Sequence, residues 1–357
     1  MCLRPSKSAS GGTSVGATLL TVFAPGRVNL IGEHTDYSGG LVLPVAIQLG
    51  VTVTGEPRGD AVRLRSAAFA DAVELTLTGE PTGPLPGWGR YVAAVVELLA
   101  PDAGLDGTIE STVPIGAGLS SSAALTVAVG LALSSRPPLE LAHLCQEAEH
   151  RAVGVPVGLM DPAVSLLGRR GHALLLDCGT EQYSYVPLPQ ELVIVVLDSG
   201  TRRSLEHSGY AQRRTELERG LAAFPGRRPL ELTVEEVEAA GLDEIPRRRL
   251  RHVVSENERV RRCVEALETR DLPALGRIFR EGHDSLRDDF EVSTPALDAI
   301  VDGAYEAGAV GARMMGGGFG GAVVALTEAD RAGDVASVVE TAYVCQAMDG
   351  AWQDPQS

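Results

Sequence analysis

The chain has 357 residues, of which 44% are hydrophobic and 22% are charged, and its formal net charge at pH 7 is −16. This length and composition are typical of a soluble protein with two globular domains, each long enough to bury its own core. The negative charge argues against a general nucleic-acid-binding role and against attachment to an anionic membrane, because either partner would repel the chain.

The cysteines and apolar runs indicate a cytoplasmic protein. The five cysteines are odd in number and lack zinc-site spacing, so we expect reduced and mostly buried thiols. No apolar run is long enough to cross a bilayer, and the N-terminus lacks the apolar core of a signal peptide. Residues 1–18 are rich in serine and glycine and should form a mobile tail. We expect a monomer with small-molecule substrates, no membrane and no nucleic acid as partner.

The first informative segment covers residues 23–44. Four ionisable side chains fall within ten residues of it: Arg27, Glu33, His34 and Asp36. One interpretation is a surface loop that holds these side chains without any function. Their density in a short glycine-rich turn, however, suits a hydroxylated ligand that needs several directed hydrogen bonds.

The next segments are expected to form structural strands and a helix without a role in chemistry. Residues 48–56 and 61–77 alternate or run apolar with β-branched residues, which is typical of strands, and residues 91–99 have a helical pattern. Trp88 and Tyr91 at this helix start would suit stacking on a nucleotide base, but aromatic residues there pack in the core more often.

A glycine-serine stretch, residues 114–125, lies between an expected strand over residues 105–113 and an apolar helix over residues 123–133. Gly116 and Gly118 permit a tight turn and the close approach of a ligand. We expect three serine hydroxyls at the helix start to act as caps beside unpaired backbone N–H groups: Ser120, Ser121 and Ser122. The stretch therefore predicts an anion site suited to phosphate, with a simple helix cap as the alternative.

This stretch is not a Walker loop, because no Gly-Lys-Ser/Thr follows it and the only lysine of the chain is Lys7. Another cation must therefore serve the phosphates. A serine hydroxyl on Mg²⁺ is the natural candidate, since Mg²⁺ prefers hard oxygen ligands and usually bridges phosphate oxygens.

A second polar turn follows an amphipathic helical pattern over residues 139–153. The turn covers residues 154–161, so Asp161 lies at another helix start, where an aspartate is ordinarily a cap. Glu149 lies near the end of the preceding helix, where a solvated helix face is the alternative to a binding role.

The later part of the chain begins with an expected buried strand over residues 192–200, followed by a charged helix over residues 201–219 that contains Tyr210. Residues 225–251 are polar and arginine-rich, and residues 256–280 have a helical pattern. Neither of these two segments indicates any chemistry.

Taken in order, these segments resemble the GHMP small-molecule kinases, named for galactokinase, homoserine kinase, mevalonate kinase and phosphomevalonate kinase. Residues 114–125 are similar to their nucleotide-binding loop. The glycine-dense residues 311–326 are similar to their third motif, which packs against that loop across the domain interface. Residues 26–37, GRVNLIGEHTDY, closely match a signature of the galactokinase subfamily that most other members lack. The resemblance covers residues 23–326.

In that subfamily the signature lines the sugar pocket. The resemblance implies that Asp36 binds the 3- and 4-hydroxyls of the sugar, that Glu33 and His34 lie near the 6-hydroxyl, and that Arg27 points at the reacting 1-hydroxyl. Tyr210 matches a tyrosine whose hydroxyl faces the sugar, with ordinary helix packing as the alternative.

The resemblance also implies the catalytic and nucleotide-binding residues. The turn Gly-x-Pro-x-Gly-x-Met-Asp is where galactokinases carry their catalytic aspartate, which is Asp161 here. Glu149 matches a magnesium-binding glutamate, and a hydroxyl of Ser121 or Ser122 would complete the site; we assign Mg²⁺ to Ser122 and Glu149. The implied nucleotide-binding residues are Gly116, Gly118, Ser120, Ser121, Ser122 and Ala123.

The implied fold is α+β, with an N-terminal GHMP kinase domain over residues 19–187 that contains a left-handed βαβ element. A ferredoxin-like C-terminal domain over residues 188–357 follows, and the active site lies between the two. The implied reaction is transfer of the γ-phosphoryl group of ATP, with Mg²⁺, to the anomeric hydroxyl of galactose. A kinase for a related sugar such as N-acetylgalactosamine, or a non-catalytic sensor of galactose and ATP, is the alternative.

Two positions depart from the subfamily pattern, although neither removes a group that the chemistry requires. Pro162 stands where galactokinases usually have glutamine, and Thr126 where many have glutamate. The sequence leaves open whether Asp161 removes a proton or orients the hydroxyl, and an Arg27 within about 4 to 6 Å would favour orientation.

Overall fold

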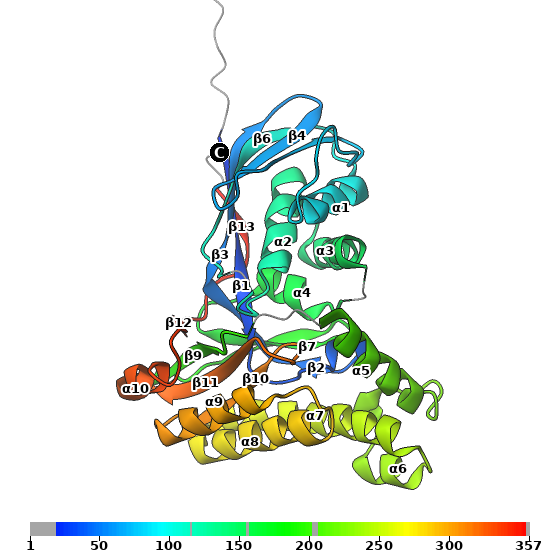
Figure 1. The fold of residues 1–357 in the computed structure, drawn as a ribbon, viewed down its shortest axis with the longest axis vertical. Coiled ribbons are helices and arrows are strands. Elements are labelled where there is room, and N and C mark those ends of the chain that lie inside the picture. Colours follow the sequence, from blue (N-terminus) through cyan, green and yellow to red (C-terminus); the bar gives the residue numbers. More distant parts are fainter. Residues whose placement is uncertain (1–18, 115, 155–156, 202–205, 355–357) are drawn as a thin grey trace, which may run out of the picture.

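A computed structural model of the chain describes residues 19–114, 116–154, 157–201 and 206–354. These residues form helices and three sheets, of which one is mixed and two are antiparallel, so the predicted α+β class is confirmed (Figure 1). The expected tail over residues 1–18 lies outside the described residues. Every helix in the described part is too short or too polar to span a membrane.

A six-stranded sheet forms the base of the N-terminal part. Its strands are β1 (Leu20–Asn29), β3 (Pro44–Pro57), β4 (Ala61–Ser66), β5 (Ala72–Thr76), β6 (Leu105–Ser111) and β13 (Trp352–Gln353). They lie in the order β13-β1-β3-β6-β4-β5. The predicted strand over residues 61–77 is in fact the two antiparallel strands β4 and β5, because the exposed residues 67–71 reverse the chain. β4 and β6 are parallel, and the chain between them forms β5 and then one helix.

Four helices cover one face of this sheet (Figure 1): α1 (Gly89–Leu99), α2 (Ser121–Leu133), α3 (Pro138–Val153) and α4 (Met160–Leu167). Helix α2 has no charged residue, and it packs on β1 and β3 as well as against α1 and α3. A helix that is apolar all round is stable only inside a core. The central position of α2 fixes the place of the serines at its N-terminal end.

The C-terminal part contains a four-stranded sheet of β9 (Leu192–Asp198), β10 (Gly311–Met315), β11 (Ala322–Glu328) and β12 (Ala342–Cys345). The strand order β10-β11-β9-β12, with helices after the first and third strands in the chain, is the ferredoxin-like arrangement that the resemblance implied. Its helices are α5 (Glu206–Leu221), α6 (Val234–Ala239), α7 (Glu244–Thr269), α8 (Leu272–Asp288), α9 (Pro295–Glu306) and α10 (Ala332–Ala336).

A small sheet joins the two parts. It consists of β2 (Leu41–Val42), β7 (His172–Asp177) and β8 (Tyr183–Pro187), in the order β2-β7-β8. Strand β7 contacts α4 and β3 of the N-terminal part, whereas β2 and β8 contact α7 of the C-terminal part (Figure 1). Short 3-10 helices lie at Asp36–Ser38, Pro229–Glu231 and Ala329–Arg331.

Two features differ from, or add to, the sequence prediction. The helix expected over residues 256–280 is interrupted: Arg270 is left-handed, with φ 57°, and ends α7, and the Asp271 side chain then accepts from Ala274 N to begin α8. At the C-terminal end, β13 returns to pair with β1, matching Val22 with Gln353. The last strand of the described chain therefore lies in the N-terminal sheet.

The core of the C-terminal part makes a stability test possible. Phe279 on α8 is fully buried, and its ring packs so closely on Gly311 of β10 that a Cβ there would lie 2.9 Å from the ring. We expect Phe279→Ala to lower the free energy of unfolding by about 3 to 5 kcal/mol, because it leaves a cavity. Phe69→Ala is the matched control, since Phe69 is 45% exposed and its loss should cost less than about 0.5 kcal/mol. Urea unfolding followed by circular dichroism measures both, and equal losses would contradict the packing described.

Candidate active site

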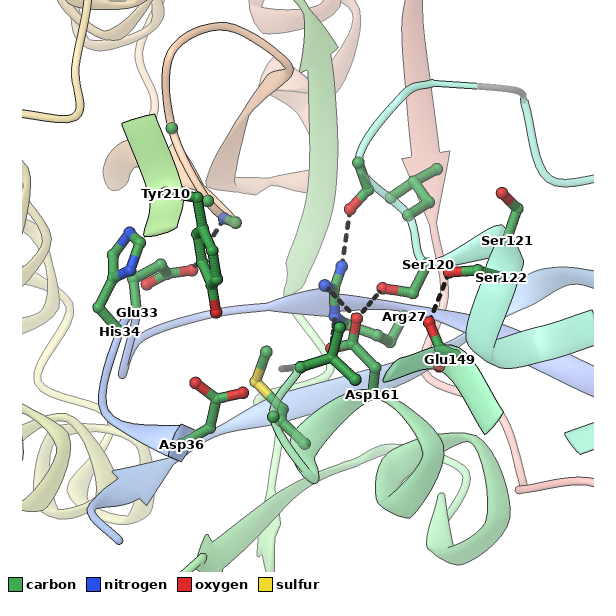
Figure 2. A pocket seen from close by; sticks show the side chains of 18 of the residues that line it. Arg27, Glu33, His34, Asp36, Ser120, Ser121, Ser122, Glu149, Asp161 and Tyr210 are labelled. Carbon is green, nitrogen blue, oxygen red and sulfur yellow. Dashed lines mark hydrogen bonds and ion pairs between the residues drawn. The ribbon is translucent and has the colours of Figure 1, made fainter. Parts of the chain in front are cut away.

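A cavity of about 560 Å³ brings together the segments singled out in the sequence. Residues of the 23–44 segment, the glycine-serine stretch, the Asp161 turn, α5 and the glycine-dense turn all line it. Figure 2 shows Arg27 and Asp161 between the three serines on one side and Glu33, His34 and Tyr210 on the other. The volume is within the range of ordinary small-molecule sites.

A bidentate ion pair lies at the middle of this cavity. Arg27 Nε is 2.7 Å from Asp161 Oδ1, and Arg27 Nη2 is 2.8 Å from Asp161 Oδ2 (Figure 2). Arg27 is on β1, where the pairing with β3 shifts its register between Pro25 and Arg27. Asp161 is in the first turn of α4. The geometry of both groups is fixed by two hydrogen bonds in one plane.

The glycine-serine stretch is attached directly to this pair. Arg27 Nη1 donates to Gly118 O at 2.6 Å, and Arg27 N donates to Leu119 O at 3.1 Å. Gly26 allows the close approach, because a Cβ at this position would lie 2.6 Å from Leu119 O. Ser120 Oγ donates to Asp161 Oδ2. Three segments that are far apart in the sequence therefore meet at one guanidinium and one carboxylate.

The serine hydroxyls do not cap α2, and this part of the prediction is wrong. Ser120 is the residue before the helix, but its backbone is left-handed, with φ 57° and ψ 50°, and its side chain accepts no capping hydrogen bond. This conformation directs its hydroxyl to Asp161 instead, and the Ser122 hydroxyl donates to Glu149. Because no serine cap covers the first backbone N–H groups of α2, the helix terminus remains suited to an anion.

Glu149 is a buried carboxylate next to this helix start. Its Oε2 accepts from Ser122 Oγ at 2.7 Å, whereas its Oε1 has no hydrogen-bond partner among the described residues. Burial, together with the negative charge of Asp161, raises the pKa of Glu149 to about 8. A cation between Glu149, Ser122 and a bound anion would relieve this unfavourable burial. No group of three or more metal-binding side chains occurs in the described part of the chain, so any cation here would need ligands from a substrate.

The predicted sugar side is also strongly acidic. Burial, and then the charge of Asp161, raises the pKa of Asp36 to about 6. Gly158 makes the position of this carboxylate possible, since a Cβ on Gly158 would lie only 1.4 Å from Asp36 Oδ2. Asp36 therefore faces the cavity because a residue of the Asp161 turn has no side chain.

Glu33 is buried deeper at the same side, with 2% of its surface exposed. Its Oε1 accepts from Asn29 Nδ2 at 2.9 Å and from Gly316 N at 3.4 Å. Its Oε2 lies 2.7 Å from Arg313 Nη2, but no hydrogen bond is directed at it within the described structure. The Glu33 carboxylate therefore has hydrogen-bond accepting capacity that the described residues leave unused, although this oxygen is buried against Arg313.

Aromatic rings complete the wall beside Glu33. His34 has a left-handed backbone, with φ 65°, and its Nδ1 lies 3.0 Å from the hydroxyl of Tyr37. Its ring centroid is 4.4 Å from that of Phe290 and 5.8 Å from that of Tyr210. Burial, and then the charge of Asp36, raises the pKa of Tyr210, so its hydroxyl stays protonated and can donate.

The sequence did not identify every residue of the cavity. Trp88 packs in the core as expected, whereas Tyr91 both packs there and lines the cavity. Tyr37 lies within residues 26–37, the segment that matches the galactokinase signature, so the sequence contained a signal for it. Phe319 lines the cavity with a left-handed backbone, φ 60°, which its sequence position does not reveal.

Three family signatures match the chain in order. The signature described as "Galactokinase galactose-binding signature" matches residues 13–57, "GHMP kinases N terminal domain" matches residues 90–169, and "GHMP kinases C terminal" matches residues 263–345. These matches agree with the three segments on which the predicted resemblance depends.

The similarity to known proteins covers almost the whole chain. A galactokinase from Bos taurus is 43% identical over 93% of this chain and 91% of its own length. A galactokinase from Haemophilus influenzae is 38% identical over 93% of this chain and 94% of its own length. Among solved structures, Lactococcus lactis galactokinase complexed with galactose has a TM-score of 0.87 at 33% identity, covering 94% of this chain and 95% of that one. Methanococcus jannaschii mevalonate kinase, at 19% identity and a TM-score of 0.66, covers 94% of this chain and 100% of that one and shares the fold.

Gly158 gives a test of the site geometry. We expect Gly158→Ala to weaken the binding of galactose, the ligand that the resemblance implies, by about tenfold or more, because the new Cβ displaces the Asp36 carboxylate. Nucleotide affinity and the melting temperature should change little. Gly87→Ala is the control, since a Cβ at Gly87 meets nothing within 4 Å. Calorimetric titration measures both ligands, and an unchanged galactose affinity in Gly158→Ala would contradict this geometry.

Proposed function

The chain belongs to the galactokinase family of GHMP kinases, and we propose that its cavity transfers the γ-phosphoryl group of ATP to the anomeric hydroxyl of galactose. The observation that carries this proposal is the Arg27–Asp161 ion pair, which lies between a helix terminus suited to phosphate and an acidic wall suited to hydroxyls. Phosphoryl transfer requires mainly this kind of positioning and charge stabilisation.

The nucleotide phosphates would bind at the start of α2. We propose that the ligands are the backbone N–H groups and hydroxyls of Gly116, Gly118, Ser120, Ser121, Ser122 and Ala123. This proposal is supported by the uncapped helix terminus and by the cavity, which all of these residues except the buried Ala123 line together with Arg27. The helix dipole adds a favourable interaction with the negative phosphates.

The residues at the helix start fit Mg²⁺. The buried Glu149 Oε1 has no hydrogen-bond partner within the described structure, and the Ser122 hydroxyl lies beside the same carboxylate. We propose that Ser122 and Glu149 hold Mg²⁺ together with phosphate oxygens and water, which are the ligands that this ion prefers. When bound, the ion offsets the negative charge of the phosphates.

Galactose would bind at the acidic wall. We propose that Asp36 accepts hydrogen bonds from the 3- and 4-hydroxyls, that Glu33 and His34 bind the 6-hydroxyl, and that Tyr210 donates to the sugar. The support is that all four side chains line the cavity on the same side of Arg27 (Figure 2). In their ionised form these carboxylates only accept hydrogen bonds, so they match a ligand rich in hydroxyl donors.

Asp161 would act on the reacting 1-hydroxyl. Both of its oxygens accept hydrogen bonds from Arg27, and one also accepts from Ser120. A carboxylate with so many donors is better suited to orient the hydroxyl than to remove its proton early. We propose that Arg27 then stabilises negative charge that develops on the transferred group.

The alternatives are not favoured. A non-catalytic sensor needs both binding sides but not the catalytic pair, and here Arg27 and Asp161 are intact and joined in the cavity. A kinase for N-acetylgalactosamine differs only in the shape of the sugar side, and the galactose-binding signature over residues 13–57 favours galactose.

The catalytic role of Asp161 can be tested with an isosteric change. We expect Asp161→Asn to lower kcat by at least about a hundredfold, because the neutral amide neither pairs with Arg27 nor accepts the hydroxyl proton equally well. Galactose and ATP affinities should stay within about tenfold of those of the unmodified protein. The exposed Asp60→Asn serves as the control. Near-normal turnover of a folded Asp161→Asn protein would show that the catalytic assignment is wrong.

Sugar preference tests the reaction itself. A coupled assay of ADP formation should show that kcat/KM for galactose exceeds that for glucose, its 4-epimer, by about tenfold to a hundredfold. The physical reason is that an equatorial 4-hydroxyl leaves a buried acceptor of Asp36 unpaired.

Asp36→Ala provides the matching variant. It should reduce the preference by impairing the use of galactose more than that of glucose. Equal use of the two sugars by the unmodified protein would refute the galactose assignment, and no turnover with any sugar despite ATP binding would support the sensor.

A further inference from the structure

A buried charge cluster of the C-terminal part lies directly behind Glu33. Arg313 on β10 is fully buried, and its Nη2 lies 2.7 Å from Glu33 Oε2 and 2.6 Å from Glu256 Oε1. Glu256 on α7 also binds Arg259, whose Nε lies 2.6 Å from Glu256 Oε2. The four groups alternate in sign, so the two negative charges are balanced by two positive ones.

Helix α7 also holds the backbone of the segment that carries Glu33. Gly32 N donates to Glu256 Oε1 at 3.0 Å, and a ring nitrogen of His252 lies 3.2 Å from Glu33 O. Each of these side chains is buried. The C-terminal part therefore fixes the main chain on both sides of the Gly32–Glu33 peptide as well as the Glu33 carboxylate.

Arg313 favours the charged form of Glu33. Burial raises the pKa of Glu33, the charge of Arg313 lowers it, the negative charge of Glu256 raises it further, and the resulting pKa is about 7. Without Arg313, two carboxylates would face each other in the protein interior. Such a pair cannot stay fully ionised, so Glu33 would hold a proton and lose part of its capacity to accept hydrogen bonds.

We propose that Arg313 is a positioning residue for the sugar: it keeps the Glu33 carboxylate oriented and ready to accept a ligand hydroxyl, and Glu256 holds Arg313 in place. Arg313 does not line the cavity, so it acts only through Glu33. This inference rests on the proposed function, in which Glu33 binds the 6-hydroxyl. Two elements of the C-terminal part, β10 and α7, then contribute to sugar recognition through residues that do not contact the sugar.

A purely structural cluster is the alternative, because breaking any buried ion pair is destabilising. The chain contains a matched example. Arg249 on α7 is 1% exposed and pairs with two carboxylates, Glu216 at 2.7 Å and Glu291 at 2.5 Å, but it makes no contact with Glu33. Variants of Arg249 therefore report the loss of a buried arginine without the loss of a partner of Glu33.

The test compares two sugars that differ in one hydroxyl. Affinities for galactose and for 6-deoxygalactose are measured by calorimetry in the unmodified protein, Arg313→Met, Arg313→Lys and Arg249→Met, together with ATP affinity and melting temperature. The unmodified protein should bind galactose about tenfold or more tighter than 6-deoxygalactose, because the deoxy sugar leaves Glu33 unpaired. Arg313→Met should lose about tenfold in galactose affinity while its affinities for the deoxy sugar and ATP stay within about threefold.

The other variants separate recognition from stability. Arg313→Lys keeps the charge and should lose less galactose affinity than Arg313→Met, and it carries the test if Arg313→Met does not fold. Arg249→Met should lower the melting temperature but keep the preference for galactose. Equal losses for both sugars in the Arg313 variants, an unchanged preference in them, or a lost preference in Arg249→Met would overturn the proposal. Absence of galactose binding by the unmodified protein would instead overturn the proposed function.

Discussion

The bidentate contact between Arg27 and Asp161 is the interaction on which the rest of the site depends. It joins β1 to α4, and the other guanidinium nitrogen of Arg27 donates to the carbonyl of Gly118. One arginine therefore fixes the Asp161 carboxylate and the glycine-serine stretch relative to each other. In the proposed mechanism the same ion pair supplies positive charge to the transferred group, so assembly of the site and its chemistry would use the same atoms.

Unbalanced negative charge surrounds this pair. Burial raises the pKa values of Glu149 and Asp36, and the charge of Asp161 adds to both effects. Each carboxylate is thus costly in the absence of ligands, and each is suited to a partner that brings positive charge or hydroxyl donors. This arrangement explains how an acidic protein can bind a polyanionic nucleotide: the helix terminus, Arg27 and a cation would together offset the charge locally.

Sequence-based prediction found the segments that line the cavity because they are short, glycine-rich and distinctive in their order. Arg27, Glu33, His34 and Asp36 came from one such segment, and the cavity contains all of them. It failed where the backbone conformation decides the contact. The predicted serine caps were wrong because Ser120 adopts a left-handed conformation, which a serine in the sequence does not indicate. The importance of Gly158 to Asp36 depends on a distance between two separate turns.

By itself, the sequence determined the central apolar helix and the segments that line the cavity, because periodicity and local motifs are properties of neighbouring residues. The α+β class was implied by the resemblance to the GHMP kinases. Only the tertiary structure decided which acidic side chains pair with which basic side chains. Residues 225–251 and 256–280 indicated no chemistry, yet Glu256 in the second segment and His252 between the two hold the backbone beside Glu33, and Arg313 holds its carboxylate. Glu33 and Arg313 are 280 positions apart in the chain. Their pairing follows from the packing of two domains, which no local pattern encodes.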